Sequence, residues 1–406
     1  MKSIVLLTQE YPYGRGESFL KDELDVYALM GVEVIVFPFK QQGSIRQLPK
    51  GISLFNAHKN QLQLSVTDLL KILCSQWVWK EFFKKFNLLF YKTSRNSFYY
   101  FLKMAFVSLN VLKKMEKQRR LKPDTILYSY WLSGLTGGMI LFNRDRPTPL
   151  VTISRAHGGD VYENRYQPAY LPFRNFIFSQ IDLVATVSKD GCEYIRSLYP
   201  QYASKIHTHY LGTRDHGFSA SSSTDQLFRL VSCAYVSPVK RLHLLVDSLK
   251  ALSLQHPDQQ LKWTHIGGGE QLHSLIDYAQ HQFSGLLIET EFTGDLENSE
   301  VLEFYRDYPV DLFVSVSSSE GIPVSMMEAI SVGIPILATD VGGVKELLAK
   351  EMLISASATD QVIAASIYSA INNLSSMRDS TKIGDSWRLH FKAEINYKVF
   401  AKIMGC

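Results

Sequence analysis

The chain has 406 residues, of which 46% are hydrophobic, and a formal charge of +4 at pH 7. This length suggests about two domains, and the hydrophobic content excludes a disordered chain. So mild a charge leads us to expect no nucleic-acid partner. The four cysteines form no CxxC pair, and no stretch reaches the roughly 18 uncharged apolar residues of a membrane span. Free thiols and an N-terminus without a signal peptide indicate a cytoplasmic protein.

The first half of the chain alternates short apolar runs with longer helical patterns. A strand at 3–8, a glycine-containing loop, a helix at about 18–30 and a strand at 32–38 form the repeating unit of a parallel sheet. Further strands are predicted at 125–129, 150–154, 183–187 and 207–211.

Residues 65–122 interrupt this alternation with a basic, helical pattern. From Lys80 to Lys122 there are twelve lysines and arginines but only two acids, Glu81 and Glu116. The stretch VWKEFFKKFNLLFYK, at 78–92, predicts a helix with one aromatic face edged by lysines; this face holds Trp79, Phe82, Phe83, Phe86, Leu89 and Phe90. Two interpretations remain open, a helix lying on an anionic membrane surface and a helix packed on the first domain. The charge ratio favours the membrane.

The second half begins after a serine-rich stretch, GFSASSSTD at 217–225, which is typical of a domain linker. Strands are then predicted at 227–234, 261–266, 286–292, 311–316 and 335–339, with helices at 242–252 and 386–404. The fold class is therefore α/β, with two doubly wound Rossmann-like domains. We expect an N-terminal domain at 1–212, a second domain at 213–385, and a C-terminal helix at 386–406 that packs back on the first domain.

Two acids mark the segment SSSEGIPVSMMEAISVGIP at 317–335. Glu320 follows a predicted strand, where open α/β sheets bind ligands, and Glu328 lies in the helix that Gly333 and Pro335 end. Pro323 suits the first turn of this helix, whose free N–H groups attract anions. Two acceptors flanking an anion site suit a nucleotide sugar. The alternative is a pair of solvated helix-start acids, which the apolar neighbours of Glu328 disfavour.

A longer segment, EGIPVSMMEAISVGIPILATDVGGVKEL at 320–347, resembles the donor-site block of glycosyltransferase family 4, whose members are retaining enzymes of the GT-B fold. Weaker blocks follow in the same order as in that family, among them GRGESF, SRAHGGD and FTGDL. Together these blocks cover both predicted domains. The resemblance implies two Rossmann-like domains facing a cleft.

The resemblance also implies residue roles. Glu320 would contact the hydroxyls of the donor sugar, and Glu328 those of the ribose. His157 would meet the donor sugar near the reacting carbon, with Asp160 supporting it or the acceptor. The remaining donor-binding positions are Gly14 and Gly16 in the first loop, Gly294 beside the nucleobase, and Gly321, Ile322, Pro323 and Val324 at the helix start.

One departure concerns the diphosphate. The family usually has an arginine and, five positions later, a lysine, both on the diphosphate. Here Lys240 stands at the lysine position, Tyr235 replaces the arginine, and Arg241 is the nearest cation that could compensate. Among all these positions, the resemblance assigns catalysis to His157, Glu320 and Lys240.

No Asp-x-Asp motif occurs, so we expect neither a metal nor another cofactor. The resemblance implies a retaining transferase that uses a nucleotide sugar and no protein nucleophile. The expected acceptor is a glycan or a lipid-linked oligosaccharide at the inner face of the cell membrane, in the synthesis of a surface polysaccharide such as capsule or lipopolysaccharide. Two alternatives stay open. One is a transferase for a small soluble acceptor. The other is an inactive glycan-binding subunit, which the replacement of the usual arginine by Tyr235 would allow.

Overall fold

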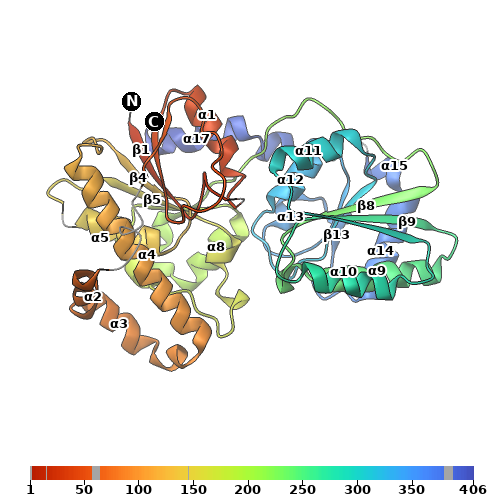
Figure 1. The fold of residues 1–406 in the computed structure, drawn as a ribbon, viewed down its shortest axis with the longest axis horizontal. Helices are drawn as coiled ribbons and strands as arrows, with labels where there is room; N and C mark the ends of the chain where they lie inside the picture. The colour runs from red at the N-terminus through yellow and green to blue at the C-terminus, as the bar shows by residue number, and fades with distance from the viewer. Residues whose placement is uncertain (1, 15, 57–64, 145, 379–386) are drawn as a thin grey trace. The chain divides into compact units, whose positions relative to one another are not determined.

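The structure, a computed structural model, describes residues 2–14, 16–56, 65–144, 146–378 and 387–406 (Figure 1). The chain forms two compact units. Unit 1 comprises Met1–Tyr210 and Tyr397–Cys406, and unit 2 comprises Leu211–Asn396. No helix among the described residues is long and apolar enough to cross a membrane.

Unit 1 is built on a seven-stranded parallel sheet in the order β3-β2-β1-β4-β5-β6-β7. Its strands are β1 Ser3–Thr8, β2 Glu33–Pro38, β3 Ile52–Leu54, β4 Ile126–Ser129, β5 Val151–Ala156, β6 Leu183–Thr186 and β7 Ile206–Thr208. The central strands are buried along their whole length, as expected for a sheet covered by helices on both faces.

Helices cover the two faces of this sheet, with α4 and α5 on one side and α1 and α17 on the other (Figure 1). The helices are α1 Leu20–Leu29, α2 Val66–Leu73, α3 Gln76–Lys84, α4 Lys92–Lys117, α5 Gly134–Arg144, α6 Gly158–Val161, α7 Arg174–Gln180, α8 Lys189–Leu198 and α17 Ala393–Met404. The 3₁₀ turns are η2 Phe86–Phe90, η3 Glu163–Arg165 and η4 Pro200–Lys205. Gly138 lets α4 and α5 approach closely, since a Cβ there would lie 1.8 Å from Ser108 Oγ.

The C-terminal helix α17 packs on unit 1 through aromatic side chains. The ring of Phe400 lies 4.2 Å from the guanidinium of Arg155 and 5.7 Å from the ring of Tyr128. Arg155 is completely buried, and it pairs with the buried carboxylate of Glu23 at 3.2 Å. A buried cation thus holds the last helix against the sheet by a cation–π contact.

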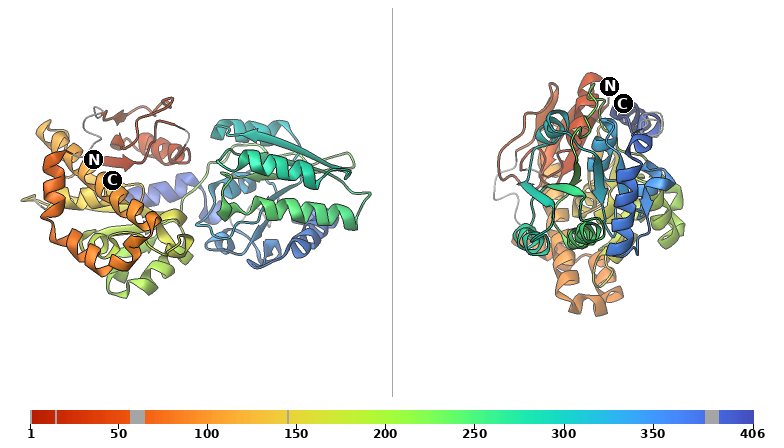
Figure 2. Two further views of the ribbon diagram at one scale, coloured as in Figure 1. Left: turned by 60° about the horizontal axis from the view of Figure 1, so that its bottom comes forward. Right: turned by 90° about the vertical axis from the view of Figure 1, so that its right-hand side faces the viewer.

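Unit 2 contains a six-stranded parallel sheet in the order β10-β9-β8-β11-β12-β13. The strands are β8 Leu227–Cys233, β9 Gln260–Ile266, β10 Ile288–Gly294, β11 Leu312–Ser315, β12 Ile336–Thr339 and β13 Leu353–Ile354. The helices are α9 Leu242–Gln255, α10 Leu272–Gln282, α11 Asn298–Asp307, α12 Val324–Ser331, α13 Val344–Leu347, α14 Asp360–Asn372 and α15 Leu374–Met377, with 3₁₀ turns η5 Pro238–Lys240 and η6 Lys350–Met352. Helices α9 and α10 lie on one side of the sheet, and α11 and α12 lie on the other (Figures 1 and 2).

Three local predictions need correction. The serine-rich stretch is not a linker, because it lies inside unit 2, where both the N–H and the hydroxyl of Ser223 bind the carboxylate of Asp311. The single helix predicted at 78–92 is broken, since α3 ends at Lys84 and η2 follows it. The strand predicted at 207–211 ends at Thr208.

The short strands β3 and β13 were not predicted. The chain changes unit between Tyr210 and Leu211, two residues before the expected boundary, and it returns to unit 1 at Tyr397. The predicted boundary at 385/386 lies outside the described residues.

Candidate functional site

The predicted lysine and the first predicted acid come together in unit 2. Lys240 lies in η5 after β8, Glu320 follows β11, and these two strands are neighbours in the sheet. Lys240 Nζ lies 2.5 Å from Glu320 Oε1 in an ion pair. Glu320 is 6% exposed, so its carboxylate depends on this partner for compensation of its charge. The pair lies at the carboxyl edge of the sheet, where such folds bind ligands.

Backbone contacts hold the two loops of this pair together. The N–H of Ser318 donates to the carbonyl of Val239 at 2.8 Å. The guanidinium of Arg241 donates to three backbone carbonyls, to Val316 at 2.6 Å, to Ala356 at 3.0 Å and to Ser317 at 3.1 Å. In the structure Arg241 therefore braces the loop that carries Lys240, and its predicted contact with a diphosphate stays a prediction.

Helix α12 begins beside this ion pair. Pro323 is the residue that precedes the helix, one position before the expected first turn, and Val324 is the first helical residue. The first helical hydrogen bond runs from the N–H of Met327 to the carbonyl of Pro323, and no described side chain caps the helix. The N–H groups of its first turn are thus available to an anion.

The predicted residues just before α12 shape this loop. Ile322 is buried, and the carbonyl of Gly321 accepts a hydrogen bond from the N–H of Gly343 at 3.0 Å. That bond joins the Glu-Gly and Gly-Gly elements of the segment at 320–347.

Glu328, the second predicted acid, lies in the middle of α12 and is 7% exposed. Its Oε1 accepts a hydrogen bond from Asn298 Nδ2 at 2.5 Å, and Asn298 is the first residue of α11. Burial, and after it the charge of Glu328, raises the pKa of the Cys233 thiol to about 12. Sequence reasoning missed Asn298, because a polar residue at a helix start is an ordinary feature.

Gly294 ends β10 with a φ of +69°, a left-handed conformation that favours glycine. Its carbonyl accepts a hydrogen bond from the N–H of Gly267 at 2.9 Å. No described atom lies within 4 Å of the position that a Cβ would take. The glycine therefore lies at the same carboxyl edge of the sheet, two strands from β8.

The first loop of unit 1 is organised by two glutamates. Gly16 donates its N–H to Glu10 Oε1 at 2.6 Å, and a Cβ on Gly16 would lie 2.0 Å from the same oxygen. Glu17, which was not predicted, is buried with a φ of +56°. Its carboxylate accepts from the backbone of residues 9–11 and from Trp131 Nε1. Four hydrogen bonds thus stabilise a conformation that is rare outside glycine.

Gly14 lies in the same loop with a φ of +62°. Arg15, between the two predicted glycines, lies outside the described residues.

His157 in unit 1 is a buried, neutral histidine. Its Nε2 donates to the carbonyl of Tyr130 at 3.1 Å, so Nδ1 is the ring nitrogen that carries the lone pair. Burial, together with the charge of Arg155, lowers the pKa of His157 to about 3. At neutral pH this side chain can position a ligand but carries no positive charge.

Asp160 braces the loop of His157. One carboxylate oxygen accepts from the backbone N–H of His157 at 2.5 Å, and the other accepts from the N–H of Leu132 at 2.6 Å. Burial raises its pKa to about 6, although the nearby Arg174 and these hydrogen bonds act in the opposite direction. The geometry matches the predicted supporting role more directly than a contact with an acceptor.

The chain also resembles known proteins. The family model of glycosyl transferases group 1 matches residues 218–386. The O-antigen biosynthesis glycosyltransferase WbnH of Escherichia coli is 38% identical over 97 residues, which cover 24% of this chain and 26% of that protein. The lipopolysaccharide core biosynthesis mannosyltransferase LpsB of Rhizobium meliloti is 31% identical over 130 residues, 30% of this chain and 35% of that protein. The matches therefore span about a quarter to a third of these relatives.

Among solved structures, Anabaena Alr3699/HepE in complex with UDP superposes with a TM-score of 0.66 over 100% of both chains, at 16% identity. This likeness establishes the fold, and the family match lies in the unit that holds the Lys240–Glu320 pair. Residues 218–386 thus match the model of the group 1 glycosyl transferases, and the two Rossmann-like units have the GT-B fold.

Proposed function

We propose that the chain transfers a sugar from a nucleotide-sugar donor to a glycan acceptor, with retention of configuration and without a metal. The observation that carries the proposal is the ion pair of the half-buried Lys240 with the buried carboxylate of Glu320, next to the uncapped start of α12. A cation and free N–H groups suit a diphosphate, and a buried carboxylate beside them suits sugar hydroxyls. The names of the relatives, which concern O-antigen and lipopolysaccharide core, support a bacterial surface polysaccharide as the product.

In this proposal different residues of unit 2 bind different parts of the donor. Lys240 and the first turn of α12 stabilise the negative charge that develops on the departing diphosphate. Glu320 binds hydroxyls of the transferred sugar, and Glu328, oriented by Asn298, binds those of the ribose. Gly294 leaves room for the base. The Anabaena protein was solved with UDP, so UDP is the first nucleotide to test.

The reaction breaks the bond between the anomeric carbon and the diphosphate oxygen. The acceptor hydroxyl oxygen bonds to the same face of that carbon, and its proton passes to the departing diphosphate. No protein nucleophile is required. In unit 1, the neutral His157 would orient the sugar, and the loop of Gly14 and Gly16 would approach the diphosphate. We place the reaction in the cytoplasm, with an acceptor glycan carried on a lipid.

The test is a thermal-shift screen of nucleotide sugars followed by donor hydrolysis and by product analysis. A matching donor should raise the unfolding temperature, because it binds only the folded state. Hydrolysis should persist in EDTA, and NMR should show the product with the anomeric configuration of the donor. If no nucleotide or nucleotide sugar stabilises the protein, the donor site is wrongly assigned.

A second function is a glycan-binding subunit without activity. Tyr235 stands at the position where the resemblance predicts arginine, its side chain is 56% exposed, and Arg241 is engaged with backbone carbonyls. Glycan binding by pure protein without donor hydrolysis would favour this subunit. Hydrolysis of any nucleotide sugar, abolished by Glu320→Gln, would exclude it.

A further inference from the structure

An exposed row of aromatic rings runs along the outer side of α3 and η2. We call it the aromatic ridge, and it consists of Trp79, Phe82, Phe83, Phe86 and Phe90. Successive ring centroids lie 5.1–5.7 Å apart, so the rings contact one another. Phe83 and Phe90 nevertheless remain 69% and 71% exposed. Monomeric soluble proteins rarely leave so continuous an apolar surface in water.

The opposite side of α3 is firmly anchored in unit 1. Trp77 stacks on Phe176 with their centroids 4.5 Å apart, and Val78 is buried. The buried carboxylate of Glu81 accepts from the hydroxyl of Tyr170 at 3.0 Å and from the N–H of Phe173 at 3.1 Å. Because these contacts fix the rotation of α3, the aromatic ridge is a stable outward face of the unit.

The charges of this region are sorted by side. Between Ser65 and Arg95 there are six lysines and arginines and two acids, and both acids point inward: Asp68 is 1% and Glu81 8% exposed. Four of the basic side chains next to the ridge are exposed: Lys80, Lys84, Lys92 and Arg95. The surface around the ridge is therefore positive, with no exposed carboxylate among the described residues 65–95.

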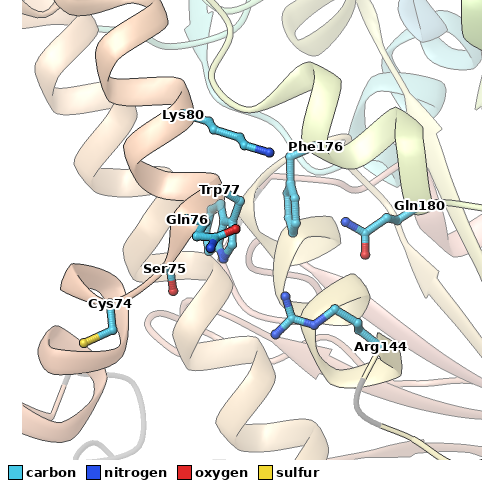
Figure 3. Close-up of a pocket in the computed structure, with 8 residues that line it drawn as sticks. All are labelled: Cys74, Ser75, Gln76, Trp77, Lys80, Arg144, Phe176 and Gln180. Atoms are coloured by element: carbon cyan, nitrogen blue, oxygen red, sulfur yellow. The ribbon is translucent and has the colours of Figure 1, made fainter.

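Two neighbouring features extend this surface. Helix α2 adds the exposed side chains of Leu69, Leu70 and Leu73, and Trp79 Nε1 donates to the carbonyl of Leu73 at 2.6 Å, so the end of α2 adjoins the ridge. On its other flank, α3 borders a hollow of about 360 Å³, into which Lys80 and Arg144 point (Figure 3). The lining of this hollow includes two cations and no carboxylate. None of the predicted site residues lies in it.

We propose that the aromatic ridge and the basic side chains around it dock unit 1 on the surface of an anionic lipid bilayer. Aromatic rings favour the interfacial layer of a membrane, and long lysine side chains reach from there to the headgroups. The positive charge selects an anionic surface over a neutral one. A second copy of the chain would bring an equally basic face against this one, so electrostatic repulsion disfavours that occupant.

The docking proposal is independent of the proposed donor site, which lies in the other unit. It adds a location to that function, because a docked unit 1 would bring the chain to an acceptor carried on a lipid, while a water-soluble donor arrives from solution. Vesicle binding and nucleotide binding are separate measurements, so failure of either leaves the other interpretable.

The experiment is co-sedimentation of the full chain with vesicles of phosphatidylcholine alone or mixed with phosphatidylglycerol, at low and high salt. We expect binding to the mixed vesicles at low salt and its loss at high salt, where surface charges are screened. Trp79 should report insertion directly. Its fluorescence should shift to the blue on mixed vesicles, and the shift should shrink in Trp79→Phe while binding persists.

Two double variants separate the rings from the charges. Phe83→Ser with Phe90→Ser should lower the partition constant at least about tenfold, since each ring loses its burial in the interface. Lys84→Gln with Lys92→Gln should lower it roughly 25-fold at low salt, about fivefold per charge. The matched control combines Leu254→Ser with Lys350→Gln, an exposed apolar residue and an exposed lysine of unit 2, and it should bind as the unaltered chain does.

All altered side chains are exposed, so we expect every variant to fold as the unaltered chain does, and unchanged unfolding temperatures would verify this. Three results would overturn the proposal. These are no binding to mixed vesicles at low salt, equal binding to neutral vesicles, and equal losses in the control. A dimer in light scattering that the ring variant dissociates, without vesicle binding, would instead assign the ridge to a contact between copies.

Discussion

The ion pair of Lys240 and Glu320 allows a test that separates stability from ligand binding. In Lys240→Ala the carboxylate of Glu320, whose side chain is 9% exposed, loses its cation. One charge-assisted hydrogen bond contributes about 1.5–3 kcal/mol, and the lysine side chain is 21% exposed, so we place the loss near 2 kcal/mol. For a unit of this size that corresponds to about 4–8 °C in unfolding temperature.

The second variant, Lys240→Ala with Glu320→Gln, removes the buried charge as well as its partner. Stability should largely return, because a neutral amide needs no counter-ion. Nucleotide affinity should not return. Each variant that lacks Lys240 should bind UDP roughly ten- to a hundredfold more weakly, at about 1.4 kcal/mol per decade.

Calorimetric titration with UDP and thermal unfolding measure the two quantities on the same samples. Glu320→Gln alone is the control, since it keeps the lysine and removes the competing carboxylate charge, so it should bind UDP at least as well as the unaltered chain while losing sugar transfer. If affinity returns together with stability in the double variant, then Lys240 acts only by holding Glu320. In that case the diphosphate contact is refuted.

Three further predictions concern residues around the two sites. Asn298→Ala should weaken UDP binding by roughly tenfold with little change in unfolding temperature, because Glu328, which we propose to bind the ribose, loses the hydrogen bond that orients its carboxylate; titration calorimetry checks this. Arg241→Ala should lower the unfolding temperature while UDP affinity changes little, if its guanidinium serves only the backbone carbonyls. His157→Asn should reduce the loss of stability between pH 7 and 4, measured by urea unfolding at each pH. The unfolded histidine takes up a proton near pH 6.5 and the folded one only near pH 3, whereas the raised pKa of Asp160 acts in the opposite direction.

Much of the fold could be predicted because both sheets are parallel. Their inner strands are largely buried on both faces, so they appear in the sequence as short apolar runs, such as the run at 3–8 that becomes β1. The edge strands β3 and β13 have only three and two residues and leave no such run. The helix predicted at 78–92 failed for another reason: its apolar period continues beyond Lys84, but the backbone changes to a 3₁₀ turn at Phe86.

The site shows a similar division between local and distant information. Glu320 and Lys240 follow neighbouring strands, so their approach to one edge could be expected from the order of a doubly wound sheet. The contact between Asn298 and Glu328 could not, because it joins two helix positions 30 residues apart by a single side-chain hydrogen bond. The backbone partners of Arg241 could not be predicted for the same reason, because they are carbonyls that only the folded loops bring near.

These contacts have a consequence for how the proposed donor would be recognised. Before a ligand binds, Lys240 neutralises Glu320, so each of the two charged groups already has a partner. A diphosphate that takes hydrogen bonds from Lys240 leaves Glu320 with less compensation, and the sugar hydroxyls can then supply the missing donors. A nucleoside diphosphate without its sugar would leave a buried carboxylate poorly satisfied. The ion pair would therefore couple recognition of the phosphate to recognition of the sugar, and it would favour the complete donor over the product that remains after transfer.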